Sequence, residues 1–315
     1  MTLAQLRYFL AITRAGSISA AAEQVHVAQP ALSQQIRLLE EELGQALFSR
    51  HARGVRLTDA GSRFQTRALG ILRQVDAIKD EFVSTRAEPV GSVTLGMATA
   101  VNMAFSVPIY EEVRRRYPGI ALRLIESMSG FVLEWAEQGR IDLALGYELE
   151  PAPGLDAERL GREPLFLIAA PGWFAKPRNR VSLAELTRIP MVLPGFPHSL
   201  RILLDRKLAE RGLKLEVTAE VDSTPSMKQL VARRAGCSIL SAHSVAEEVS
   251  RGQLLAIPIG KPGITRSIDL SVGGQRRHDP AVQAVREVAA AIVREGLAAG
   301  VSPRGNQPAT RRTSP

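Results

Sequence analysis

The stretch that most constrains the fold is residues 17–44, SISAAAEQVHVAQPALSQQIRLLEEELG. It contains two helical runs separated by a short break. The first run, residues 19–25, is rich in alanine, so another helix can approach it closely. The second begins at Gln29-Pro30, because proline suits the first turn of a helix, and it ends at Gly44, a typical helix-stop residue. The stretch therefore predicts two helices joined by a short turn.

The second helix has two unlike faces. One is an apolar stripe at three- and four-residue steps, formed by Leu32, Ile36, Leu39 and Leu43. The other carries short hydrogen-bonding or basic side chains, namely Gln29, Pro30, Ser33, Gln34 and Arg37. Such side chains can read base edges in a DNA major groove, which admits one helix. The arrangement predicts a helix-turn-helix, and the alternative is an ordinary amphipathic hairpin.

The flanking segments complete this unit. Residues 2–15 predict a helix with an apolar face, ended by Gly16, that holds the reading helix in place. Residues 47–57 predict two short strands around a turn at 52–54. The basic residues of this hairpin are Arg50, Arg53 and Arg56, with His51 beside them. We expect the three arginines to contact phosphates or the minor groove, and the alternative is a solvated loop. The whole chain has a formal net charge of +8, which suits an anionic partner.

This region resembles the N-terminal part of LysR-type transcriptional regulators. The matching features are the AGS-x-S-AAA run, the V-x-QPALS-x-QI-x-x-LE-x-x-LG helix, the LF-x-R segment and the L-T-x-AG segment. The resemblance implies a winged helix-turn-helix, a linker helix and a two-subdomain effector domain similar to periplasmic binding proteins. It also implies a sequence-specific regulator that acts as a homodimer or homotetramer, with RNA polymerase as a candidate partner.

A long helix is predicted after Thr58, to about Thr85. It carries a coiled-coil-like seam formed by Gly61, Phe64, Ala68, Ile71, Val75, Ile78 and Phe82. A globular helix can show the same stripe, but the regular repeat favours pairing with a second copy. A symmetric dimer then predicts an inverted-repeat site on double-stranded DNA.

Beyond a hinge at Pro89 and Gly91, predicted strands and helices alternate, which favours parallel sheets built from βαβ units and an α/β fold overall. The first helix of this region is predicted at Ser106–Tyr117. We expect four segments: a DNA-binding domain, 1–58; a linker and dimerisation helix, 59–87; an effector domain, 88–300; and a disordered tail, 301–315. The resemblance divides the effector domain into subdomain I, residues 91–161 and 266–300, and subdomain II, residues 162–265. It places the crossings near 160–163 and 263–265.

Ligands of open α/β domains lie beyond the carboxyl ends of strands. By resemblance, the expected effector contacts are Thr99, Ala100, Ser129, Ser199 and Arg201. Hydroxyl groups at helix N-termini suit a carboxylate, although helix capping is the alternative role. Alanine at position 100 and apolar neighbours indicate a weakly polar effector, or none. The segment 194–198, PGFPH, resembles nitrogen-assimilation members of the family, some of which need no effector.

Other function classes lack support in the sequence. Cys237 is the only cysteine, and the five histidines show no close pairing, so no metal or other cofactor is expected. No nucleophile elbow or phosphate-binding glycine loop is present, so we do not expect an enzyme. No membrane-spanning run or signal peptide is evident, which predicts a cytoplasmic protein that does not contact a membrane. The main alternative is an effector-independent DNA-binding regulator controlled by its abundance; a solute-binding protein or enzyme is disfavoured.

Overall fold

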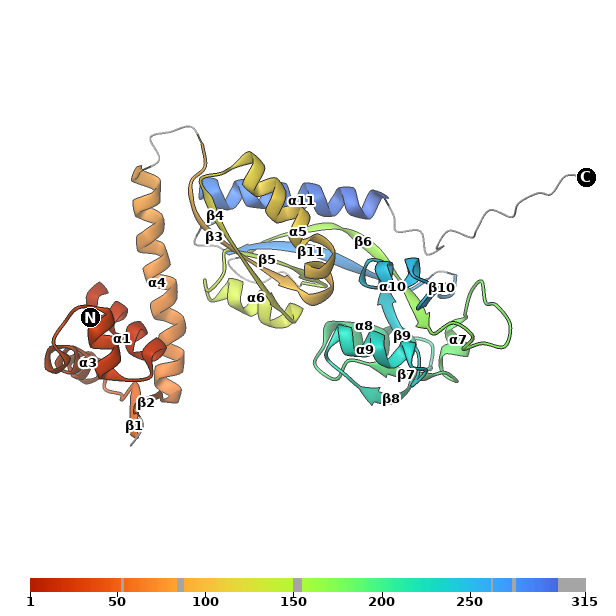
Figure 1. Ribbon diagram of the computed structural model, residues 1–315, viewed down its shortest axis with the longest axis horizontal. Helices are drawn as coiled ribbons and strands as arrows, with labels where there is room; N and C mark the ends of the chain where they lie inside the picture. The colour runs from red at the N-terminus through yellow and green to blue at the C-terminus, as the bar shows by residue number, and fades with distance from the viewer. Residues whose placement is uncertain (52–53, 84–87, 150–154, 262, 274–275, 300–315) are drawn as a thin grey trace, which may run out of the picture.

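The computed structural model describes residues 1–51, 54–83, 88–149, 155–261, 263–273 and 276–299. An N-terminal group of short helices is followed by one long helix and then by an α/β region (Figure 1). None of the helices in these ranges is long and apolar enough to cross a membrane. The predicted order of winged helix-turn-helix, linker helix and α/β region is confirmed.

The N-terminal region contains the predicted helices and hairpin. Its elements are α1 (Leu3–Ala15), α2 (Ile18–Gln24), α3 (Gln29–Leu43), β1 (Phe48–His51), β2 (Gly54–Leu57) and α4 (Asp59–Val83). The Thr2 side chain caps α1, and Gly16 ends it in the left-handed conformation that glycine adopts without strain. Gly44 ends α3 in the same way. The helix boundaries therefore follow from local capping residues.

One apolar core joins these helices to the hairpin. The Phe9 ring lies 5.0 Å from that of Phe48 in β1 and 4.9 Å from that of Phe64 in α4, measured between centroids. A carboxylate oxygen of Glu40, on α3, accepts hydrogen bonds from the backbone amides of Leu47 and Phe48 at 2.7 and 3.1 Å. The hairpin and α3 are therefore fixed to each other by both packing and polar contacts.

Part of the seam predicted for the long helix packs inside the chain itself. Gly61 and Ala68 are buried and Phe64 is half-buried, all against the N-terminal core. Ile71 also packs on the edge of this core. The assignment of Gly61 and Ala68 to a partner helix was therefore wrong, because α4 covers the apolar face of α1 at these buried positions, whereas the half-buried Phe64 and Ile71 keep exposed surface. The half-buried Val75 stays available for pairing, and the side chains of the two last seam positions lie outside the described residues.

The C-terminal region contains the remaining elements. They are β3 (Gly91–Ala98), α5 (Thr99–Arg116), β4 (Ile120–Ser127), α6 (Ser129–Glu137), β5 (Leu143–Tyr147), β6 (Leu155–Ala169), α7 (Leu183–Leu186), β7 (Pro190–Leu193), α8 (Ser199–Ala209), β8 (Glu216–Glu220), α9 (Thr224–Ala232), β9 (Ser238–Ser241), a 3-10 turn (His243–Val245), α10 (Ala246–Ser250), β10 (Leu255–Pro258), β11 (Thr265–Gly273) and α11 (Pro280–Ala299). Strands and helices alternate for most of this region, as predicted.

The main sheet is mixed, which corrects the expectation of parallel sheets. Its strand order is β10-β6-β11-β5-β3-β4, with β9 also paired to β6. Strand β3 is parallel to β4 and β5, but β11 is antiparallel to both β5 and β6. The long strands β6 and β11 run side by side from one half of this region into the other (Figure 1). The first predicted crossing, 160–163, is therefore part of the continuous strand β6, and the second, 263–265, ends at the first residue of β11. The antiparallel pairing of these two strands makes the sheet mixed.

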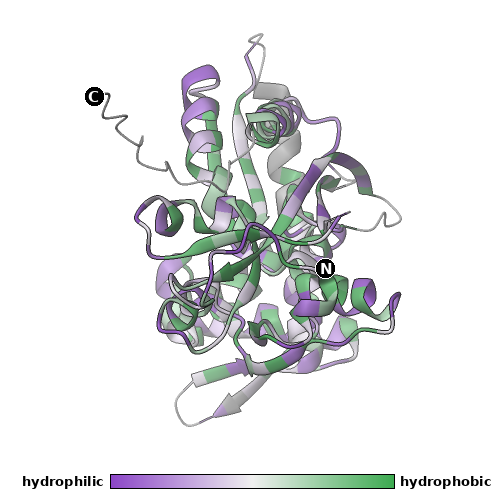
Figure 2. Cartoon of the chain, turned by 90° about the vertical axis from the view of Figure 1, so that its right-hand side faces the viewer, coloured by the Kyte–Doolittle hydropathy of each residue, from purple (hydrophilic) through white to green (hydrophobic). Residues whose placement is uncertain are grey.

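Two separate cores lie on either side of these crossing strands. One is formed by β3, β5, β11 and the helices α5 and α11, and the other by β6, β7, β9 and the helices α8 and α9. Cys237 is buried in the second core, where desolvation raises the pKa of its thiol to about 12. Helices in Figure 2 alternate between hydrophobic and hydrophilic residues, as expected when one face packs on a core. Each half of the region therefore has its own interior.

Helix α5 begins seven residues earlier than the predicted start at Ser106, so Thr99 and Ala100 lie in its first turn and not in a loop. The reason is a buried stripe that continues through Pro108 at four-residue steps. It consists of Val101, Phe105, Ile109 and Val113.

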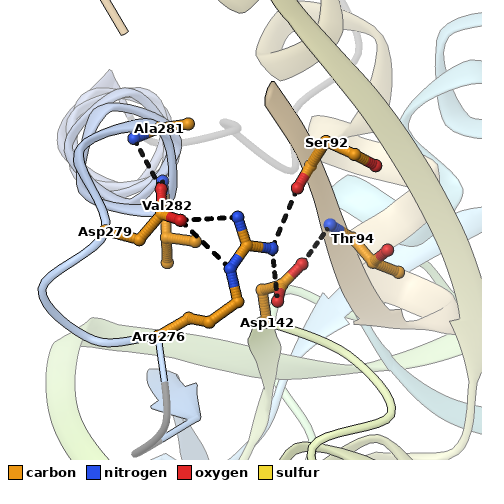
Figure 3. Close-up of polar contacts among 7 residues, drawn as sticks. All are labelled: Ser92, Thr94, Asp142, Arg276, Asp279, Ala281 and Val282. Carbon is orange, nitrogen blue, oxygen red and sulfur yellow. Dashed lines mark hydrogen bonds and ion pairs between the residues drawn. The ribbon is translucent and has the colours of Figure 1, made fainter. Parts of the chain in front are cut away.

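A polar cluster fixes α11 to the start of the sheet (Figure 3). Arg276 donates from one nitrogen to the backbone oxygen of Ser92 and to Asp142, at 2.9 and 3.0 Å, and from another to Asp279 at 2.6 Å. Asp142 also accepts from the backbone amide of Thr94 at 2.7 Å. The second oxygen of Asp279 accepts from two amides in the first turn of α11. The cluster thus holds the segment that follows the linker.

Candidate DNA-reading helix and ligand cleft

Helix α3 presents the predicted reading face to solvent. Gln29, Pro30, Gln34 and Arg37 are exposed and Ser33 is half-buried. On the opposite face Leu32, Ile36 and Leu39 are buried. The structure therefore brings all five predicted side chains together on one exposed surface, as a major-groove reader requires.

Local contacts leave this surface free to bind. Gln29 reaches the Ser33 hydroxyl at 3.4 Å, and Arg37 lies 3.6 Å from Glu41, with 67% of the Arg37 side chain exposed. Exposed ion pairs of this kind contribute little stability, so a phosphate or base can replace Glu41. Beneath the surface, Gln5 of α1 donates to the side chain of Gln35 at 3.2 Å and so fixes α3 to α1.

The hairpin is attached to the turn between α1 and α2. The Val55 amide donates to the Gly16 carbonyl oxygen at 2.9 Å. A Cβ at Gly54 would lie 2.3 Å from the same oxygen, and its φ is +132°, so only glycine fits. Arg56 is exposed, and the backbone of Arg50 lies in β1. Arg53 lies outside the described residues.

A small inner cavity of about 20 Å³ lies where the two halves of the C-terminal region meet. The predicted contacts Thr99, Ala100 and Ser129 line it from the first half. His198 and Thr224 line it from the second half. Three of the five predicted effector contacts therefore share one cavity, which is the size of a water molecule.

A larger outer cavity of about 570 Å³ adjoins the inner one, and Met128, Ser129 and Tyr147 line both. Its apolar lining comes mainly from Phe131, Leu133, Leu149, Pro197, Ile202 and Leu203. The predicted contact Ser199 lies here, with the charged residues Glu134, Glu148, Arg159 and Arg206. The two cavities together form one cleft with a narrow polar end and a wide apolar end.

Arg201 lines neither of these cavities. Its guanidinium lies 2.8 Å from Asp205 and 2.8 Å from Glu220, and only 14% of its side chain is exposed. Burial lowers the pKa of Arg201, but hydrogen bonds to these two carboxylates outweigh it and raise the pKa above its ordinary value. The structure thus places Arg201 in an internal ion-pair network, away from the other four predicted contacts.

Helix N-termini from both halves point their first residues into the cleft. Helices α5 and α6 have no side-chain cap, so their first amides are not satisfied by a capping residue. The His198 ring nitrogen Nδ1 accepts from the Leu200 amide at 3.2 Å and caps α8. Burial, reinforced by Arg266, lowers the pKa of His198, which keeps it neutral in this role. The uncapped N-termini of α5 and α6 therefore add partial positive charge to the cleft without a histidine charge.

Arg266, which sequence reasoning missed as a site residue, also lines the inner cavity. It is 3% exposed, and its Nε donates to Glu163 at 2.7 Å, which is 2% exposed. Burial acts to raise the pKa of Glu163, but Arg266 and His243 outweigh it and hold that pKa below its ordinary value. The guanidinium carbon lies 3.3 Å from the centroid of the Tyr147 ring. The sequence did carry one signal for this pair. Glu163 lies in the predicted crossing 160–163 and Arg266 directly follows the crossing 263–265, so opposite charges mark the two crossings.

Comparison with known proteins agrees with this architecture. The profile described as "Bacterial regulatory helix-turn-helix protein, lysR family" matches residues 3–62, and "LysR substrate binding domain" matches residues 86–293. The chain is 30% identical over 295 residues to the nitrogen assimilation regulatory protein Nac of Escherichia coli strain K12, covering 93% of this chain and 95% of Nac.

Solved structures show the same fold. A full-length OxyR variant from Pseudomonas aeruginosa superposes with a TM-score of 0.72 at 23% identity, covering 93% of this chain and 95% of that one. Full-length CbnR in complex with its target DNA gives a TM-score of 0.71 at 21% identity, with 93% and 100% coverage. This chain therefore belongs to the LysR family and is a DNA-binding transcriptional regulator with an effector-binding domain.

Proposed function

We propose that this regulator reads an inverted-repeat promoter site with Gln29, Pro30, Ser33, Gln34 and Arg37 of α3. The observation that carries this proposal is the exposed polar face of a helix whose opposite face buries Leu32, Ile36 and Leu39. Arg50, Arg53 and Arg56 of the hairpin would add sequence-independent contacts to the DNA backbone. The CbnR structure, which holds that protein's target DNA, supports a DNA complex for the shared fold.

The active form in this proposal is a homodimer or homotetramer. Residues 1–58 bind DNA, residues 59–87 pair through α4, and residues 88–300 form the effector domain. Val75 is the described seam position that the chain's own core leaves free. Because its partner is promoter DNA, the protein acts in the cytoplasm, where RNA polymerase is its candidate partner. Its role is regulatory and not enzymatic, as for its named relatives.

A small molecule in the cleft would control this activity. A ligand that binds one arrangement of the two halves more tightly than another shifts the population toward it. The inner cavity is only large enough for water in this structure. That observation keeps the second candidate open, a regulator that needs no effector and is controlled by its abundance.

Footprinting on the DNA upstream of the protein's own gene tests both candidates. We expect a protected inverted repeat with one helical turn, or a multiple of it, between half-site centres. A footprint that candidate metabolites alter would support effector control, whereas one that none alters would favour the effector-independent regulator. Absence of any sequence-specific protection would contradict the proposal as a whole.

A further inference from the structure

The hairpin of β1 and β2 has one face on the core and one face in solvent. The side chains that pack against the N-terminal core are those of Phe48, Val55 and Leu57. Successive side chains of a strand point to opposite faces, so Ser49 and His51 lie on the outer face, where His51 is exposed. Arg56 pairs with Ser49 across the two strands, and directly opposed residues share a face. A histidine and an arginine therefore lie on the solvent face of this hairpin.

Hydrogen bonds on this outer face fix which ring nitrogen of His51 carries a proton. The Ser49 hydroxyl donates to the Arg56 carbonyl oxygen at 3.3 Å, and the hydroxyl oxygen lies 3.2 Å from His51 Nε2. A hydroxyl has only one proton to donate. Because that proton is used on Arg56, Ser49 can only accept from His51, and Nε2 must carry the hydrogen. In the neutral ring, Nδ1 is therefore an acceptor.

Proton uptake at Nδ1 changes what the exposed ring can bind. The neutral ring offers nothing to a phosphate at Nδ1, because both groups are hydrogen-bond acceptors. The protonated ring carries an N–H donor at Nδ1 and a positive charge, and hydrogen bonds between charged partners are about twice as strong as neutral ones. Histidine is also the side chain whose charge ordinarily changes between about pH 5 and 8. A phosphate contact by His51 therefore requires the charged ring.

The charges around the hairpin favour that protonated ring once DNA is bound. The charged side chains on the elements that pack against the hairpin are those of Arg14 in α1, Glu40 in α3, Arg56 in β2 and Asp59 in α4. In the part of the chain that the structure describes, neither carboxylate pairs with His51, and the histidine that does form an ion pair is His243. In the free protein Arg56 repels a positive charge on the same face. DNA phosphates offset this repulsion.

We propose that His51 contacts a DNA phosphate only when its ring is protonated, so that DNA binding takes up a proton. This inference rests on the proposed DNA-binding function, and it adds to that function a contact residue and a dependence on pH. Proton uptake and DNA binding are linked, so each strengthens the other by the same factor. Affinity for DNA therefore rises as pH falls. The gain is the same for every base sequence, because phosphate contacts carry no direct sequence information.

Anisotropy titrations of the full-length chain at pH 8 and pH 5.5, on the footprinted site and on random DNA, test this inference. His51→Gln keeps an N–H for Ser49 but stays neutral at both pH values. The ratio of Kd at pH 8 to Kd at pH 5.5 should be about three- to tenfold larger for wild-type protein than for His51→Gln, on both DNAs. The wild-type salt slope should also steepen by up to about 0.9 at the lower pH. His51→Arg, which is always charged, should bind at pH 8 about as tightly as wild-type protein does at pH 5.5.

His278→Gln is the matched control, because His278 is also exposed but lies in the effector region, just before α11. Its pH dependence should equal that of wild-type protein. The same pH dependence in His51→Gln as in wild-type protein would overturn the inference, and so would a wild-type salt slope that does not change with pH. A pH effect confined to the specific site would also overturn it, since that result indicates base reading. In each case wild-type discrimination between the two DNAs would persist, whereas loss of that discrimination would contradict the proposed function itself.

Discussion

Gly61, in the first turns of α4, offers the sharpest test of how the winged helix is held together. A Cβ at this position would lie 2.1 Å from the carbonyl oxygen of Leu47, a backbone atom that cannot rotate away. The Gly61 amide also donates to the Thr58 hydroxyl oxygen at 2.9 Å, which caps the helix. Gly61→Ala must therefore move the start of β1 away from α4, and we expect an overpacking cost of about 1–3 kcal/mol.

Helix propensity alone predicts the opposite sign, because alanine is favoured over glycine by about 1 kcal/mol inside a helix. Gly70 provides a matched control in the same helix, since its added Cβ would meet only the Gln138 carbonyl oxygen at an ordinary 3.5 Å. Gly70→Ala should raise the free energy of unfolding by up to about 1 kcal/mol. Urea denaturation followed by circular dichroism should separate the two variants by about 1–4 kcal/mol. Equal stability of the two variants would refute the close contact between position 61 of α4 and the Leu47 carbonyl oxygen.

Further predictions concern DNA affinity, assembly and pH. Arg56→Ala should weaken binding to all DNA sequences and reduce the salt slope by about one unit; an unchanged slope in anisotropy titrations would exclude a phosphate contact. Val75→Glu should convert the native assembly to monomers in light scattering, and persistence of that assembly would exclude pairing through α4. The depressed pKa of Glu163 means that its stabilisation is complete above the unfolded value of 4.5 and is lost as pH falls through the folded value. Between pH 7 and pH 3 the melting temperature of the double variant Arg266→Gln with Glu163→Gln should therefore fall less than that of the wild-type protein. Identical pH profiles would show that the Arg266–Glu163 ion pair does not cause this loss of stability.

The local signals in the sequence were strong for the N-terminal region. The proline at the second residue of α3 and the glycine after its end set its boundaries, and the apolar stripe set its buried face. The same kind of signal misplaced the start of α5, because Pro108 lies in the helix interior while the buried stripe runs through it to Val101. Apolar periodicity thus identified the buried face of a helix more reliably than it identified where the helix begins.

Contacts between distant segments could not be predicted in this way. A 3-4 repeat identifies the apolar side of α4 but not its partner, and Gly61 and Ala68 turned out to face the chain's own core. The antiparallel pairing of β6 with β11 joins residues about one hundred positions apart, so no local pattern reports it. For the same reason the Arg266–Glu163 pair was missed, whereas Thr99 and Ser129 were expected from the family resemblance and line the inner cavity.

In the proposed function, the exposed face of α3 distinguishes one DNA sequence from another, and the exposed Gln34 side chain tests this most directly. Binding of Gln34→Ala to the footprinted site and to random DNA should be compared in the same salt. We predict a loss of about 1–3 kcal/mol on the specific site with little change on random DNA. Gln35→Ala, the neighbour that faces α1, should leave this discrimination unchanged. Equal losses by Gln34→Ala on both DNAs would contradict the account.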